Sequence, residues 1–183
     1  MTTTRTKPEP PPAAVAADAH WAAKMDRLRA RTLAETTFVI CDDTEVRTRF
    51  QRAQRNLEVT QAFAKDHPGD SEAATDAATA QTAYDEAKTA YDQVAIPLRF
   101  RALPRTALEA LYKQHQPSES ESDEGKQWAD SFPAALIAAA SVDGMSEDEA
   151  RELLSSWSLV EADAMFNAAY SVQNTTRADL GKG

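Results

Sequence analysis

The sequence is poor in residue types on which many enzymes and extracellular proteins depend. It has one cysteine, Cys41, and only three histidines and five glycines in 183 residues. A lone cysteine cannot form an internal disulfide, which is typical of a reducing compartment. The glycines form no phosphate-binding loop. The histidines, at positions 20, 67 and 115, lack the spacing of paired metal ligands. We therefore expect no cofactor and no metal.

Long apolar runs are also lacking. The longest is far too short to span a membrane, and residues 1–18 contain no continuous apolar stretch of the signal-peptide kind. We expect no membrane association and a cytoplasmic location. Aromatic residues make up only 7% of the chain, although 42% of it is hydrophobic and alanine is abundant. This composition favours close-packed helices over a β-sandwich.

Positive charge is scarce in the second half of the chain. The net charge is −9, and residues 68–183 contain 9 Lys and Arg against 20 Asp and Glu. Nonspecific binding to nucleic acid needs a basic surface, so we expect no nucleic-acid partner. An acidic surface instead favours solubility or a basic partner.

The N-terminal third begins with a tail and a helix. Residues 1–12, which include PEPPP, cannot bury apolar area and are predicted to be disordered. Residues 13–33 are predicted to form a helix, because Trp21, Met25, Leu28 and Thr32 fall on one face.

Two short strands are predicted to pair around a long helical insertion. Residues 36–41 are β-branched and apolar, and residues 96–102 alternate apolar side chains with arginines. Between them, residues 45–93 carry heptad-spaced apolar positions on both sides of a His67–Asp70 break. This pattern predicts an antiparallel helical hairpin inserted between the strands, within a segment that spans 34–103.

Residues 104–176 are predicted to form a C-terminal helical domain, followed by a tail at 177–183. Pro104 begins its first helix, and the acidic segment 117–126 is expected to be a mobile loop. Three short helices follow between positions 128 and 174. Ser146 and Glu149 form a capping box, and Ser158 can cap the last helix. The fold class expected is mainly α, a small C-terminal helical bundle with a two-stranded β element.

No group of residues in the sequence has the pattern of a catalytic site. Cys41 lies among apolar residues and is interpreted as buried and inert. Asp143 and Gly144 lack the alternating oxygen ligands of a calcium loop. We therefore expect no enzyme. The residues that stand out are apolar, and we interpret them as a combined core and partner-binding groove: Trp128, Phe132, Leu136, Trp157, Met165 and Phe166.

The order of features over residues 94–183 resembles the tail assembly chaperones of long-tailed, siphovirus-type bacteriophages. The matching features are the arginine-rich strand and helix at 98–112, a helix end at His115-Gln116-Pro117, and the FPAALIAAA segment at 132–140. The helix start at Met145–Ala150, Trp157 and the FNAA run at 166–169 complete the likeness. The hairpin at 45–93 has no counterpart in it.

The resemblance implies a chaperone that binds the tape measure protein in the host cytoplasm, keeps it soluble and is absent from the mature virion. It also implies a −1 ribosomal frameshift near Leu180-Gly181-Lys182, whose codons can contain the slippery heptamer G-GGA-AAG. The extended product would recruit the tail tube protein. Self-association is left open by the sequence.

Two other interpretations remain at this point. In the first, the chain is a coiled-coil structural adaptor or a virion component, with the hairpin as its working element. In the second, it is an acidic mimic of DNA.

Overall fold

A computed structural model describes residues 12–177, and side chains from His20 onward. The chain is mainly helical, with a two-stranded antiparallel sheet. It divides into two compact units, up to Leu33 and from Ala34. The expected tail at 1–12 lies outside the described residues, except for Pro12, and so does Leu180-Gly181-Lys182.

The first unit contains helix α1, Pro12–Arg29. Trp21 and Leu28 on this helix are exposed, and Met25 is half-buried. The helix ends four residues earlier than the 13–33 segment expected from the sequence, so Thr32 does not continue its apolar face.

The sheet consists of β1, Glu35–Ile40, and β2, Ile96–Arg101. Thr37 lies opposite Arg99, and Phe38 lies opposite Leu98. Exposed and partly buried side chains alternate along β1, and in β2 Phe100 is fully buried between the exposed Arg99 and Arg101. On the exposed face, the Arg101 Nε donates to Glu35 Oε1 over 2.7 Å. Cys41, expected in the strand, follows it directly and is buried.

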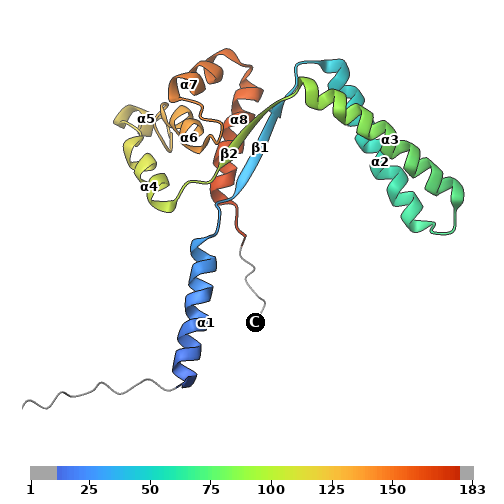
Figure 1. Cartoon of the computed structure of the whole chain (residues 1–183). Helices are drawn as coiled ribbons and strands as arrows, with labels where there is room; N and C mark the ends of the chain where they lie inside the picture. Colours follow the sequence, from blue (N-terminus) through green and yellow to red (C-terminus); the bar gives the residue numbers. More distant parts are fainter. Residues whose placement is uncertain (1–11, 178–183) are drawn as a thin grey trace, which may run out of the picture. The chain divides into compact units, whose positions relative to one another are not determined.

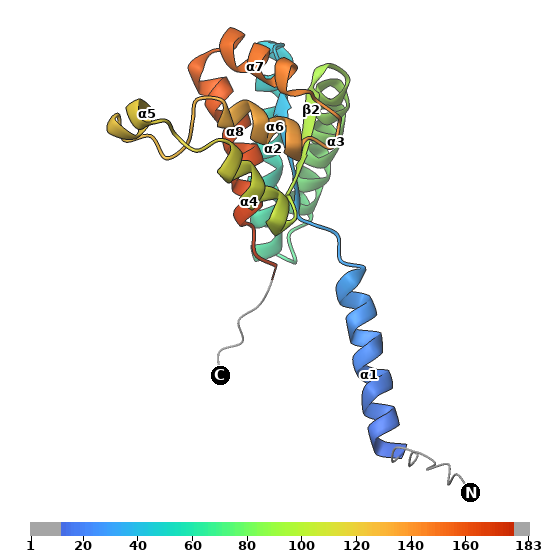
Figure 2. The same ribbon diagram turned by 90° about the vertical axis from the view of Figure 1, so that its left-hand side faces the viewer.

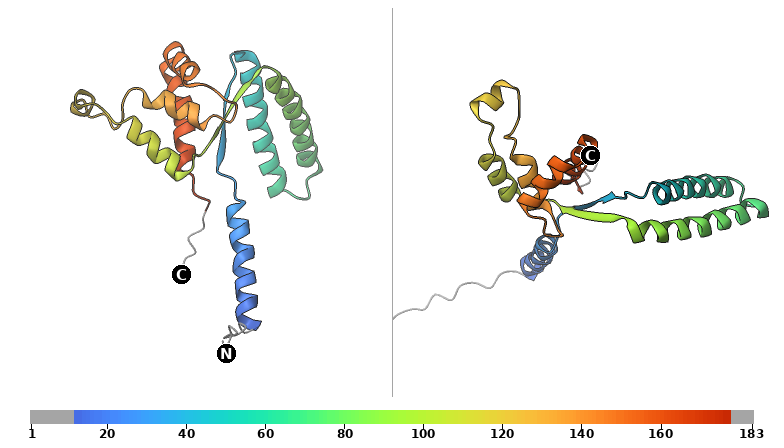
Figure 3. Two further views of the ribbon diagram at one scale, coloured as in Figure 1. Left: turned by 60° about the vertical axis from the view of Figure 1, so that its left-hand side comes forward. Right: turned by 90° about the horizontal axis from the view of Figure 1, so that it is seen from above.

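Helices α2, Thr44–Asp66, and α3, Ser71–Val94, lie side by side and run in opposite directions (Figures 1 and 3). Asp43 caps α2, and Asp70 caps α3. Alanines are the buried residues of α3, which allows the two backbones to approach closely: Ala73, Ala80 and Ala87. Phe50 of α2 stacks on Tyr91 of α3, with ring centroids 4.6 Å apart.

The remaining helices follow β2 in the chain, and the short helix at Glu119–Asp123 projects away from the others (Figure 2). They are α4, Arg105–Gln114; α5, Glu119–Asp123; α6, Phe132–Ala140; α7, Glu147–Ser156; and α8, Leu159–Ser171, followed by the 3₁₀ turn η1, Val172–Asn174. The expected caps are present, since Ser146 and Glu149 form a capping box and Ser158 accepts from the Glu161 N–H.

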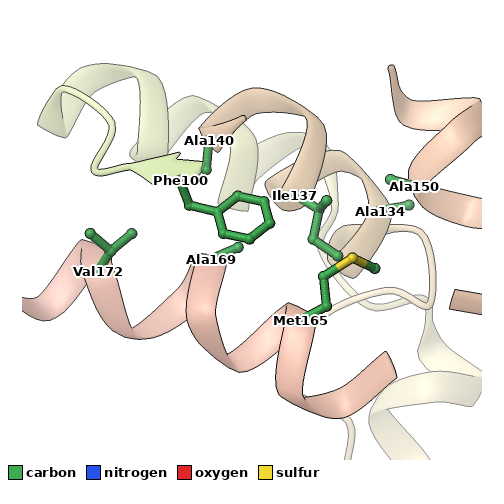
Figure 4. Packing of buried hydrophobic residues seen from close by; sticks show 8 residues of the cluster. All are labelled: Phe100, Ala134, Ile137, Ala140, Ala150, Met165, Ala169 and Val172. Carbon is green, nitrogen blue, oxygen red and sulfur yellow. The ribbon is translucent and has the colours of Figure 1, made fainter. Parts of the chain in front are cut away.

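Phe100 of β2 occupies the centre of this core, against α6 and α8 (Figure 4). Ile137 from α6 and Met165 from α8 are fully buried beside it. Small residues, among them Ala134, Ala150 and Ala169, let the short helices pack closely. No residue of α2 or α3 belongs to this cluster.

A network around Asp143 fixes the turn after α6 to the sheet. Its Oδ2 accepts from the Arg99 N–H over 2.8 Å, and its Oδ1 accepts from the Arg99 guanidinium over 2.7 Å. The backbone donor and then the guanidinium lower the pKa of Asp143. Val142 N–H donates to the Arg99 carbonyl over 2.9 Å.

The acidic segment differs from the loop expected at 117–126, because it contains helix α5. Ser118 and Glu121 form a capping box at its start. Glu121 also accepts from the backbone N–H of Asp130 over 2.9 Å. Reciprocal capping satisfies the first N–H groups of a helix, which offsets the poor helix propensity of the serine-rich sequence.

Candidate partner-binding surface

The six apolar residues selected from the sequence fall into two groups. Phe132, Leu136 and Met165 are fully buried, so they belong to the core and are not available to a partner. Trp128, Trp157 and Phe166 are only partly buried. Trp128 precedes α6 rather than lying on it, because that helix begins at Phe132 with a proline in its first turn.

Trp157 lies apart from the other two partly buried residues. Its ring is 6.4 Å from that of Phe38 in β1, and it packs against the central core. Trp157 therefore joins α7 to the sheet.

Trp128 instead belongs to an aromatic cluster built on α4, α6 and α8. Its ring centroid lies 5.0 Å from Phe132, 6.0 Å from Phe166 and 5.6 Å from Tyr170. Tyr112 of α4 also stacks on Phe132, with ring centroids 5.1 Å apart. Such pairs are each worth roughly 0.5–1.5 kcal/mol beyond the area they bury.

Two interactions hold the segment before α6 against α4. The Ala129 N–H donates to the His115 carbonyl over 2.9 Å, and His115 Nδ1 lies 2.8 Å from Ser131 Oγ. Within the cluster, burial raises the pKa of the Tyr112 hydroxyl, and its hydrogen bond with Tyr170 raises that pKa further. The hydrogen bond between Tyr112 and Tyr170 therefore joins α4 to α8 within the cluster.

A hollow of about 460 Å³ opens where Tyr112 and Trp128 reach the surface. Polar residues form its rim: Glu109, Lys113, Gln116 and Gln127. An aromatic floor with a polar rim is typical of sites that receive an apolar side chain from a partner. Tyr112 and Tyr170 are not among the residues selected from the sequence, and the fold brings them to Trp128 from distant helices.

A second, smaller cleft of about 180 Å³ lies where the end of β1 meets α8. Val39, Cys41, Val160 and Ala164 are among its lining residues. Leu159 and Val160 at the start of α8 are 76% and 77% exposed, unusually high for large apolar residues in a helix. Leu159 and Val160 are thus more exposed than Trp128, which is partly buried.

Side chains of the metal-ligating kinds are not clustered in the described part of the chain. There, no three His, Cys, Asp or Glu side chains lie together as metal ligands would. Over the same residues, no helix combines the length and the apolar character needed to cross a membrane.

Comparison of this chain with models of protein families, with curated proteins and with solved structures found no match.

Proposed function

We propose that this chain is a tail assembly chaperone of a long-tailed bacteriophage, which binds the tape measure protein in the host cytoplasm. The resemblance over residues 94–183 motivates this proposal. The structural observation that supports it best is the aromatic hollow at Tyr112 and Trp128, a fixed apolar surface with a polar rim.

A long helical protein exposes apolar stripes that associate with one another unless they are covered. In this proposal, an apolar side chain from a tape measure helix occupies the hollow beside Trp128. The C-terminal helical bundle is the binding domain, and the α2–α3 hairpin is an insertion between its strands. The acidic surface keeps coated assemblies apart by charge repulsion.

Binding must be reversible, because tail tube subunits displace the chaperone during assembly. A shallow hollow suits this requirement, since many weakly bound copies of the chaperone along one long protein together cover it well. We further propose that a −1 frameshift near Leu180-Gly181-Lys182 produces a longer form that recruits the tail tube protein. Intact-mass analysis of infected cells should then show two products with one N-terminus, and a single 183-residue product would contradict the frameshift.

Two partly buried tryptophans provide a matched test of the hollow. Trp128→Leu should weaken binding to the tape measure protein at least tenfold, about 1.4 kcal/mol. Trp157→Leu removes a comparable ring that packs on Phe38 away from the hollow, so its affinity should stay within about threefold of wild type. Isothermal titration calorimetry measures the affinity of each variant for the tape measure protein. Equal losses of affinity in the two variants would argue against the hollow as the binding site.

The hairpin supports a second candidate, a structural adaptor that acts through α2. Val59 and Phe63 of this helix are exposed apolar residues, and Phe63 stacks on His67. An exposed apolar pair on a long helix is typical of coiled-coil contacts. In this alternative, removal of the hairpin abolishes partner binding, whereas the chaperone proposal predicts that binding persists.

A further inference from the structure

The outer edge of β1 carries backbone groups that point away from the sheet. In an antiparallel pair, the N–H and C=O groups of successive residues point alternately toward the partner strand and away from it. Arg99 directs its backbone groups away from β1, toward Asp143 and Val142. Its partner in the register is Thr37, so the groups of Thr37 also point outward, as do those of Glu35 and Val39.

The two edges of the sheet differ in how they are protected. Residues Ser141–Asp143 cover the edge of β2, through a bridge between Phe100 and Ser141 and the bonds to Arg99. Among residues 12–177, no backbone group bonds to the outward groups of Thr37 or Val39. β1 also lacks the proline, lysine or bulge with which proteins commonly block an open edge.

The sequence of β1 is complementary to itself. When two copies run antiparallel with Thr37 on the two-fold axis, Thr37 lies opposite Thr37, and Glu35 lies opposite Val39. Threonine pairs stabilise neighbouring strands, and this register places no like charges directly opposite one another. Glu35, the only charged residue of β1, is already paired with Arg101 within its own copy.

We infer that two copies of this chain pair through β1, which produces a continuous four-stranded sheet. Val39, 40% exposed in the single chain, becomes covered by its neighbour across the new pair. The outward N–H and C=O groups of each copy bond to those of the other. This inference concerns the sheet edge and does not depend on the proposed function.

A charge exchange at the two-fold axis tests the pairing. Thr37→Lys places two lysines opposite each other, and Thr37→Glu places two glutamates there, so each variant alone should be monomeric. An equimolar mixture should dimerise, because lysine then faces glutamate. Thr37→Pro should also be monomeric, since proline removes only an outward N–H and leaves the bonds to β2 intact.

Sedimentation velocity on the full chain over a range of concentrations gives the answer, with circular dichroism as the check on folding. We expect a wild-type dimer that all three single variants disrupt and that the mixture restores. A wild-type chain that stays monomeric, a dimer that persists in the variants, or a mixture that fails to dimerise would each overturn the inference. If Thr37→Pro does not fold, the lysine and glutamate variants decide the question alone.

Discussion

Asp43 is the side chain that fixes where α2 begins. Its Oδ1 accepts from the N–H groups of Glu45 and Val46, each over 3.0 Å. Its neighbour Asp42 is exposed and makes no comparable bond to α2. The backbone is extended at Asp43 and helical from Thr44, which makes Asp43 the cap of α2.

Asp43→Ala should therefore lower the free energy of unfolding by about 1 kcal/mol, because it leaves N–H groups of the first turn unsatisfied. Asp42→Ala is the matched control and should change that free energy by less than about 0.5 kcal/mol. Urea denaturation measures both values. Equal effects of the two substitutions would show that the cap is not the source of the loss.

Hydrogen bonds to the Glu121 carboxylate lower its pKa to about 2. The carboxylate accepts a hydrogen bond from the Ser118 N–H, which is the largest cause of the lowered pKa. It also accepts from the Asp130 N–H and from the Ser118 hydroxyl, and both bonds lower the pKa further. A lowered pKa stabilises the folded segment at pH values above the ordinary pKa of glutamate, about 4.3. That contribution is lost as the pH falls from about 4.3 to about 2.

Hydrogen exchange at the Asp130 amide should report this change. We expect its protection, corrected for the intrinsic pH dependence of exchange, to be constant above about pH 5 and to decrease toward pH 2. Glu121→Gln should give low protection at every pH, because the amide is a weaker acceptor than the carboxylate. The Glu149 capping box, also with a lowered pKa, provides an internal comparison.

At the scale of elements, long patterned segments were the easiest to predict. The sequence indicates a helix at α2, at α3 and at each C-terminal helix except α5, because heptads and capping residues act over a few neighbouring positions. Helix α5 was missed although Ser118 and Glu121 have capping-box spacing. Its acidic, serine-rich composition favoured a loop, and the bond from Asp130 that supports it comes from outside the segment.

The candidate site could also be predicted only in part, because it depends on contacts from outside each segment. Periodicity identifies apolar faces but does not separate a residue in the core from one at its boundary. Phe132 and Trp128 looked equivalent in sequence, yet the first is enclosed by Tyr112 and Phe166 while the second reaches the surface. Contacts between α4 and α6 decide which of the two residues is buried, and these two helices are distant in sequence.

Close packing in the hairpin depends on the small size of Ala80, which is buried in α3. Ala80→Leu should destabilise the hairpin by about 1–3 kcal/mol, because the additional carbons separate the helices or force strained rotamers. Ala83→Leu, three residues away on the exposed side of the same helix, should change stability by less than about 0.5 kcal/mol. Thermal denaturation followed by circular dichroism compares the two.

For the whole molecule, the core of the second unit contains no residue from α2 or α3. Ile40 and Ile96 are partners at the end of the sheet. Replacing residues 41–95 by Asn-Gly joins them through a two-residue turn that suits antiparallel strands. We expect the shortened chain to remain folded, as judged by near-ultraviolet circular dichroism. Loss of folded structure would show that the hairpin supports the bundle.

The same shortened chain distinguishes the two functional candidates. If the C-terminal bundle binds the tape measure protein, binding should survive removal of the hairpin. If α2 is the binding element, binding should disappear while the bundle stays folded.

The most direct test of the central claim is the solubility of the tape measure protein from the same phage after co-expression with this chain. We predict that the wild-type chain and Trp157→Leu move the tape measure protein into the soluble fraction, and that Trp128→Leu does so much less. A tape measure protein whose soluble fraction is the same with and without this chain would contradict the proposed chaperone function.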